Sequence, residues 1–187
     1  MMDLFPIPLL KEKINLDCAS ITKEILEAKA LTTNYTSYFE EDTFLIESSS
    51  AIKQIILEHA NKFFPTISDR NIIFNEENIN IWWNVYKEGD HHCFHDHGRS
   101  LLSGTIYVNI DESSSPIEFE SPLDGLIRTW ASDDLKDRWK QSETFGFPAI
   151  KNNIIMTWPP WLKHSVPAQG KTDNPRITIS FNLDKRQ

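Results

Sequence analysis

Hydrophobic residues in the first third of the chain recur at helical spacing in two segments. The first runs from Asp17 to Ala30, and Asp17 or Ser20 can cap its first turn. The second, Ser48–Ile67, opens with serines that can act as caps and is expected to end before Pro65. The pattern predicts two amphipathic helices. Their apolar faces consist of Ile21, Ile25 and Ala28 in the first, and of Ile52, Ile55, Ile56, His59 and Phe63 in the second. His59, a lone histidine on a helix, is interpreted as a packing or surface residue.

From Asn71 onward the pattern changes to short β-branched and aromatic runs separated by Gly, Pro, Asp and Ser. Such runs predict the strands of an antiparallel sandwich or barrel. The predicted strands are 78–86, 102–110, 116–121, 149–158, 164–168 and 176–183. The connection 124–148 is long, so we expect it to be a functional lid or to contain a helical turn around 133–140.

The order of these elements predicts a mainly β fold with flanking helices. A chain of 187 residues is expected to form a single domain around one core. We place the helices mostly in residues 1–66 and the β core in about 71–187.

Composition narrows the class of protein. Hydrophobic residues make up 40% and charged residues 25%, which is typical of a soluble globular protein that folds alone or as a small oligomer such as a homodimer. The net charge of -8 argues against binding to a nucleic-acid backbone. No apolar run is long enough to span a bilayer, the start lacks a signal peptide, and the chain has only two cysteines. We therefore expect a cytoplasmic protein that does not bind membranes.

Four of the six histidines lie in one stretch, Asp90–Ser100, which we call the histidine cluster. In an extended chain Cys93, His95 and His97 point one way, while His92, Phe94 and Asp96 point the other way. His95 and His97 can then bind one metal ion. A third ligand must come from elsewhere, and His164, at a turn before a late strand, is the best placed. His95, His97 and His164 would leave positions open for substrates.

Other interpretations of the cluster stay open at this point. It can be a solvated loop, or a closed zinc site that uses Cys93 with two or three histidines. Asp96 can replace His97 as a ligand if a bulge reverses its face. His91 and His92 are interpreted as groups at the rim or behind the ligands, and Cys93 as a small packing residue rather than a nucleophile.

The residues downstream of the cluster carry a resemblance. The stretches "GDHHCFHDHGRSLLSGTIYVNI", "PIEFESP", "WPPWLKHSV" and "PRITISFNL" resemble, in that order, the iron(II)/2-oxoglutarate-dependent oxygenases of phages and bacteria. That family, similar to prolyl hydroxylases, carries His-x-His before a Ser-Gly-x-x-Tyr strand, a Pro-x-Trp-Leu-x-His turn and an Arg-Ile-Ser-x-x-Phe-Asn ending. Pro160 and Thr178 depart slightly from this pattern. The resemblance covers about residues 80–183 and implies a double-stranded β-helix (jelly roll).

The resemblance also implies an enzyme with two cofactors. Fe(II) on the three histidines would leave sites for chelating 2-oxoglutarate and for dioxygen, and we expect a hydroxylase. Arg176, twelve residues after His164, is the expected partner of the distal carboxylate of 2-oxoglutarate. Thr178 shares its strand face with Arg176 and Ser180 and can support the same carboxylate. Asn84 and Tyr107 are further candidates for binding the cosubstrate, and Trp82, Trp83, Trp158 and Trp161 are expected in the core and at the rim.

Two rival functions come from other classes. A cupin-like dioxygenase would use His-x-His and a late histidine without 2-oxoglutarate, but it usually carries a Glu after the pair, and "GRSLLSG" supplies none. A non-enzymatic metal-binding accessory module is the second rival. His97 stands where the wider oxygenase superfamily has a carboxylate, although the family resembled here includes His-x-His. The sequence does not distinguish a small-molecule substrate from a protein side chain.

Overall fold

The computed structural model describes residues 7–30, 34–38, 46–122, 144–146 and 151–184. Two helices, α1 (Cys18–Lys29) and α2 (Ser49–Ile67), precede most of the strands. A short 3-10 turn, η1 (Glu76–Asn78), leads into the β region. The strands are β1 (Leu10–Lys13), β2 (Ile79–Tyr86), β3 (His92–His95), β4 (Leu102–Asn109), β5 (Glu118–Glu120), β6 (Thr144–Gly146), β7 (Ile154–Trp158), β8 (His164–Val166) and β9 (Arg176–Leu183).

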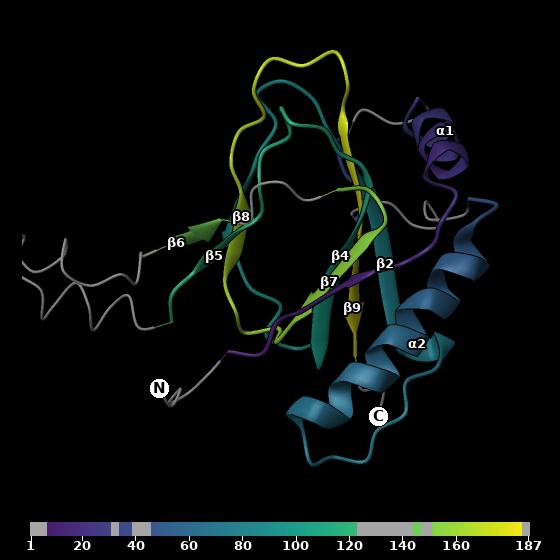
Figure 1. Ribbon diagram of the computed structural model, residues 1–187, viewed down its shortest axis with the longest axis vertical. Helices are drawn as coiled ribbons and strands as arrows, with labels where there is room; N and C mark the ends of the chain where they lie inside the picture. Colours follow the sequence, from purple (N-terminus) through teal and green to yellow (C-terminus); the bar gives the residue numbers. More distant parts are fainter. Residues whose placement is uncertain (1–6, 31–33, 39–45, 123–143, 147–150, 185–187) are drawn as a thin grey trace, which may run out of the picture.

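The strands form two antiparallel sheets that face each other. The larger sheet has the order β1-β7-β4-β9-β2, and the smaller has the order β3-β8-β5-β6. Figure 1 shows three layers, with α1 and α2 on one side of the larger sheet and β5, β6 and β8 on its other side. The predicted jelly roll with outer helices is therefore confirmed.

Period-two alternation divides the larger sheet into a core face and a face toward the smaller sheet. On β9 the residues Ile177, Ile179, Phe181 and Leu183 join the apolar core against the helices. Arg176, Thr178 and Ser180, which alternate with them, line a cavity between the sheets. A single strand thus contributes to both the core and the cavity.

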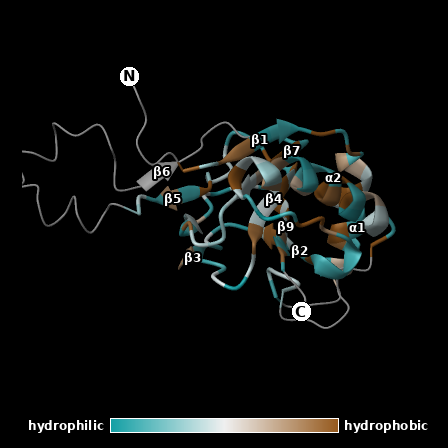
Figure 2. Ribbon diagram, turned by 90° about the horizontal axis from the view of Figure 1, so that it is seen from below, coloured by the Kyte–Doolittle hydropathy of each residue, from teal (hydrophilic) through white to brown (hydrophobic). Residues whose placement is uncertain are grey.

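The helices bury the apolar face of the larger sheet. Ile21 and Ile25 of α1, together with Ile52 and Ile56 of α2, are buried in the same cluster as Trp83. Hydrophobic colouring gathers where the helices meet the sheet in Figure 2. A second apolar cluster, between the two sheets, consists of Tyr107, Ile117, Phe119, Met156, Trp158 and Leu162. Neither helix in the described part of the chain is long and apolar enough to cross a membrane.

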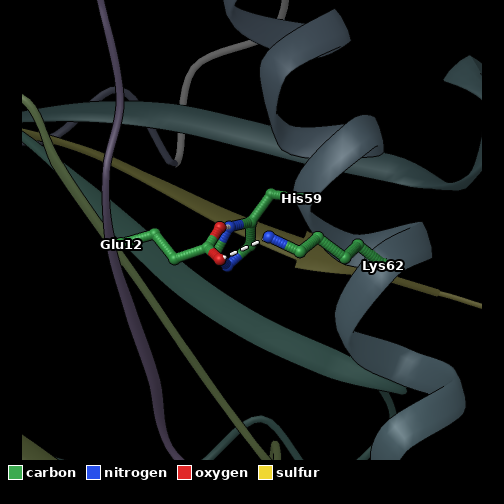
Figure 3. Close-up of polar contacts among 3 residues, drawn as sticks. All are labelled: Glu12, His59 and Lys62. Carbon is green, nitrogen blue, oxygen red and sulfur yellow. Dashed lines mark hydrogen bonds and ion pairs between the residues drawn. The ribbon is translucent and has the colours of Figure 1, made fainter.

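A small polar cluster of Glu12, His59 and Lys62 connects β1 to α2 (Figure 3). The Glu12 carboxylate lies 3.0 Å from Nδ1 of His59 and 2.7 Å from Nζ of Lys62. His59 is only 4% exposed, and this burial lowers the pKa of its imidazole despite the nearby carboxylate. His59 is therefore a buried packing residue, and its neutral ring donates to Glu12.

Two predicted boundaries need correction. α2 continues through Pro65 to Ile67, because a proline in the last turn removes only one hydrogen bond and Ser68 N still donates to Phe64 O. The predicted strand 149–158 begins only at Ile154, because Asn153 adopts a positive φ of 63°. Of the predicted lid, residues 144–146 form β6, and the remainder lies outside the described residues.

Candidate metal centre

Three histidines from two parts of the chain line the same cavity. His95 ends β3 and is paired in register with His164, the first residue of β8. His97 lies two residues beyond β3. One ring nitrogen from each histidine lies within 4.8 Å of the others, and no other such group with three potential ligands occurs among the described residues. The structure thus brings together the three histidines that the sequence predicts as ligands.

Hydrogen bonds orient two of these rings. Nδ1 of His95 lies 2.9 Å from the Cys93 carbonyl, and Nδ1 of His164 lies 3.0 Å from the Leu162 carbonyl. A carbonyl only accepts, so Nδ1 of each ring carries the proton and Nε2 keeps its lone pair. This tautomer fits a metal ion bound through Nε2.

Burial also keeps two of the three rings uncharged. Desolvation, with a contribution from His95, lowers the pKa of His164 to about 3 and the pKa of His97 to about 4. Both rings are therefore neutral at neutral pH, and neutral imidazole is the form that binds a metal. The donor set fits Fe(II), since imidazole is a common iron ligand.

The cavity beside the histidines is lined by aromatic and polar side chains. Arg176, 2% exposed, packs between the rings of Tyr86 and Tyr107, with its Cζ atom 5.1 Å and 5.6 Å from the two centroids. Its Nε donates to Ser115 O at 3.1 Å. Among the described residues no carboxylate forms an ion pair with Arg176. Its terminal nitrogens are thus suited to an incoming anion.

The other predicted cosubstrate residues surround Arg176. Asn84 and Thr178 line the cavity and are paired in register, with Nδ2 of Asn84 3.4 Å from Thr178 Oγ1 and 3.0 Å from Ser180 Oγ. Asn84 Oδ1 has no partner among the described residues. Tyr107 contacts the guanidinium of Arg176 but does not line the cavity, and its buried hydroxyl also has no partner among the described residues. Unpartnered buried polar atoms are unusual, and in this position they fit a polar ligand.

The prediction that side chains alternate between two faces was wrong for His92 and Cys93 of the histidine cluster. Between His92 and His95 the chain advances three residues while the partner strand advances two, which is a β-bulge. His92 therefore stacks on His95 at 4.1 Å and lines the cavity, on the same side rather than the opposite one. Cys93 is exposed instead of facing the ligands.

Two alternative ligands do not reach the three histidines. Asp96 is exposed, and its carboxylate accepts a hydrogen bond from Gly98 N at 3.2 Å. Cys93 does not belong to the group either. Of the four tryptophans considered above, Trp82 and Trp158 line the cavity, Trp83 is in the core, and Trp161 is 52% exposed.

Residues 34–38 pack on two residues that line the cavity, a position that the sequence pattern did not predict. They run beside the edge strand β2, where Ser37 N donates to Trp83 O and Val85 N donates to Tyr35 O. The Tyr38 ring packs on Trp82, and the Tyr35 ring packs on Tyr86. The only sequence signal was two tyrosines in a polar stretch, which is too weak to indicate this position.

Comparison with known proteins agrees with this geometry. Residues 80–182, more than half of the chain, match the family described as "Putative 2OG-Fe(II) oxygenase". No curated protein matches the sequence.

Several solved structures share the fold. A prolyl-4-hydroxylase from Pseudomonas putida has 10% identity and a TM-score of 0.55, and the match covers 97% of this chain and 89% of that one. HygX from Streptomyces hygroscopicus, solved with nickel and 2-oxoglutarate bound, has 8% identity and a TM-score of 0.57, with 96% and 83% covered. AviO1 from Streptomyces viridochromogenes has 9% identity and a TM-score of 0.59, with 95% and 90% covered.

The family match spans the histidine cluster, His164 and Arg176 in one continuous block. The chain therefore belongs to the 2OG-Fe(II) oxygenase family, whose enzymes use Fe(II) and 2-oxoglutarate.

Proposed function

We propose that this oxygenase is a hydroxylase in which His95, His97 and His164 hold Fe(II) and Arg176 anchors 2-oxoglutarate. The observation that carries the proposal is the composition of one cavity. Three clustered imidazoles, two of them with lowered pKa values, share it with a buried arginine that has no carboxylate partner among the described residues. A metal site and an anion site in one cavity are what the two cofactors require.

Each side chain has a separate task in this proposal. Bound at the histidines, iron together with 2-oxoglutarate and dioxygen supplies the oxidation of a substrate C–H bond, with succinate and carbon dioxide as coproducts. The always-charged guanidinium of Arg176 binds the distal carboxylate through two parallel hydrogen bonds. The Thr178 hydroxyl donates to the same cosubstrate from the cavity wall, and Asn84 fixes that wall through the hydrogen bonds from its Nδ2 to Thr178 and Ser180. Tyr107 packs on the guanidinium of Arg176 and holds it in position.

The apolar side chains of the cavity wall favour a reaction that is shielded from water. The buried side chains of Trp82, Trp158, Ile117 and Val166 line it. Apolar walls exclude water and strengthen the contact between the guanidinium and its anion. Arg176 also favours this proposal over a cupin-like dioxygenase, which has no need for a buried cation.

The experiment is an anaerobic titration of the purified protein with Fe(II) and 2-oxoglutarate, followed by visible absorption. The expected result is the charge-transfer band of iron chelated by a 2-oxo acid, which His164→Ala abolishes. His91→Ala is the matched control, because His91 is an exposed histidine of the same cluster and lies outside the three-histidine group. Absence of the band in the wild-type protein would refute the proposed site.

The reaction class is tested separately. A panel of small metabolites and peptides is incubated with 2-oxoglutarate and ¹⁸O₂, and succinate is measured. A true substrate should increase the rate of succinate formation. If the reaction is a hydroxylation, this substrate gains one labelled oxygen atom for each succinate formed. Succinate formation coupled to a product without labelled oxygen would show that the oxygenase carries out a different oxidation.

A further inference from the structure

The third histidine of the metal site differs from the other two in its hydrogen-bond partner. Nδ1 of His95 and Nδ1 of His164 face backbone carbonyls, which only accept. Nδ1 of His97 instead lies 3.2 Å from Nδ2 of the Asn182 side-chain amide, in the orientation that the structure gives to this amide. An amide has an accepting end and a donating end, so the tautomer of His97 depends on which end faces the ring.

The Asn182 side chain is fixed by burial, strand pairing and a hydrogen bond. It lies on β9, is 6% exposed, and is paired in register with Ser103 of β4. In the same orientation Oδ1 of the amide accepts a hydrogen bond from Ser103 Oγ at 2.8 Å, and Ser103 is fully buried. Two successive hydrogen bonds, from Ser103 to Asn182 and from Asn182 to His97, thus connect the larger sheet to a proposed metal ligand that lies just after β3.

The two orientations of this amide have opposite consequences. With Nδ2 toward His97, the amide donates to Nδ1, and the proton of the neutral ring is then on Nε2. With Oδ1 toward His97, the amide accepts from Nδ1–H, and Nε2 keeps its lone pair. A half-turn of the amide preserves both contacts, because the Ser103 hydroxyl can either donate or accept.

We propose that Asn182 is a positioning residue that presents Oδ1 to His97 Nδ1–H and Nδ2 to Ser103 Oγ, and so keeps Nε2 of His97 free to bind the metal ion. This inference rests on the proposed function, in which His97 is a ligand. It assigns to a side chain of β9 the task that backbone carbonyls perform for His95 and His164. Partners of this kind fix the ring and raise the affinity of a ligand for its metal.

Two variants of Asn182 separate this role from simple packing. Asn182→Asp is nearly isosteric and presents only accepting atoms, so it retains the Nδ1–H tautomer of His97. Asn182→Ala removes the partner and leaves the tautomer unfixed. The probe is Co(II) added to the metal-free protein, with affinity measured by calorimetry, and thermal unfolding confirms that each variant is folded.

The expected affinities follow from the hydrogen bond. Asn182→Ala binds Co(II) about 10- to 100-fold more weakly than wild type, as is usual when the partner of a ligand is lost. Asn182→Asp binds at least as tightly as wild type. Folded variants with equally weakened affinity, or with unchanged affinity in both, would overturn the proposal.

A second readout does not involve metal. In ¹⁵N-histidine-labelled, metal-free protein, NMR distinguishes the two tautomers of His97. The proposal predicts the Nδ1–H form in wild type and in Asn182→Asp, and a mixture in Asn182→Ala. The Nε2–H form in the wild type would overturn it.

One further variant distinguishes failure of the inference from failure of the proposed function. If His97→Ala binds Co(II) as tightly as wild type, His97 is not a ligand and the proposed site fails. If His97→Ala loses affinity while Asn182→Ala does not, only the role of Asn182 fails.

Discussion

Substitution of Arg176 by methionine should separate cosubstrate binding from protein stability. The guanidinium is buried between Tyr86 and Tyr107, and its Nε donates a hydrogen bond to Ser115 O. No carboxylate in the described part of the chain pairs with it. Without a ligand the protein therefore carries a buried charge whose desolvation is compensated only in part. The unbranched methionine side chain can replace the arginine stem between the two rings.

The two expected effects differ in size. Removal of a partly compensated buried charge is often neutral or stabilising, and the lost cation–π contacts amount to about 0.5–2 kcal/mol each. These terms largely cancel, so we expect an unfolding free energy within about 1 kcal/mol of wild type. Binding of 2-oxoglutarate loses two charge-assisted hydrogen bonds of about 1.5–3 kcal/mol each. The dissociation constant should therefore rise by about 10²- to 10⁴-fold.

Urea denaturation of the metal-free protein and anaerobic titration of 2-oxoglutarate into the Fe(II)-loaded protein measure the two effects. Arg176→Lys keeps the charge but lacks the planar fork, and it should bind 2-oxoglutarate with intermediate affinity. Arg99→Met is the surface control, because Arg99 is exposed. A loss of more than about 3 kcal/mol in stability with unchanged cosubstrate affinity would show that Arg176 is a structural residue.

Three further predictions concern the scaffold. In Gly104→Ala the new Cβ would meet the Phe181 ring and lie 2.5 Å from a backbone oxygen, so urea denaturation should show a loss of about 1–3 kcal/mol; an unchanged midpoint would contradict this packing. Asn153 combines a φ of 63° with a 2.7 Å hydrogen bond from Leu16 N to its Oδ1, so Asn153→Ala should cost about 1–3 kcal/mol and Asn153→Gly less; equal losses would exclude a backbone contribution. The folded-state pKa of His59 is lowered below its unfolded value of about 6.5, so its stabilising contribution is present above that pH and lost as the pH falls below it. Stability of metal-free His59→Gln, measured by denaturation from pH 8 to about 5, should therefore decline less than that of wild type, and parallel profiles would refute the assignment.

The sequence predicted most of the elements that carry a strong hydrophobic period. β9 shows why, since four apolar residues alternate with four polar ones and each set faces a different layer. β1 was missed because its residues, LKEK, have no apolar period, and its strand conformation comes from pairing with β7. Local pattern does not encode such a tertiary pairing.

The site too was predicted only where local spacing determines it. His95 and His97 were chosen from spacing, and His164 from its place before a late strand, and the structure brings the three together. The position of His92 was wrong because a bulge adds one residue to β3, and period-two alternation fails across it. The contact between Asn182 and His97 joins residues 85 positions apart, and spacing alone gave no sign of it.

Residues 34–38 lie outside the block 80–182 that matches the family. The three imidazoles, Arg176 and the other residues that line the cavity all lie inside that block, whereas Tyr35 and Tyr38 pack from outside it on Tyr86 and Trp82. These two tyrosines therefore contact the cavity only through the residues on which they pack. Substitutions of Tyr35 or Tyr38 would change the support of the lining without replacing any residue of the lining itself.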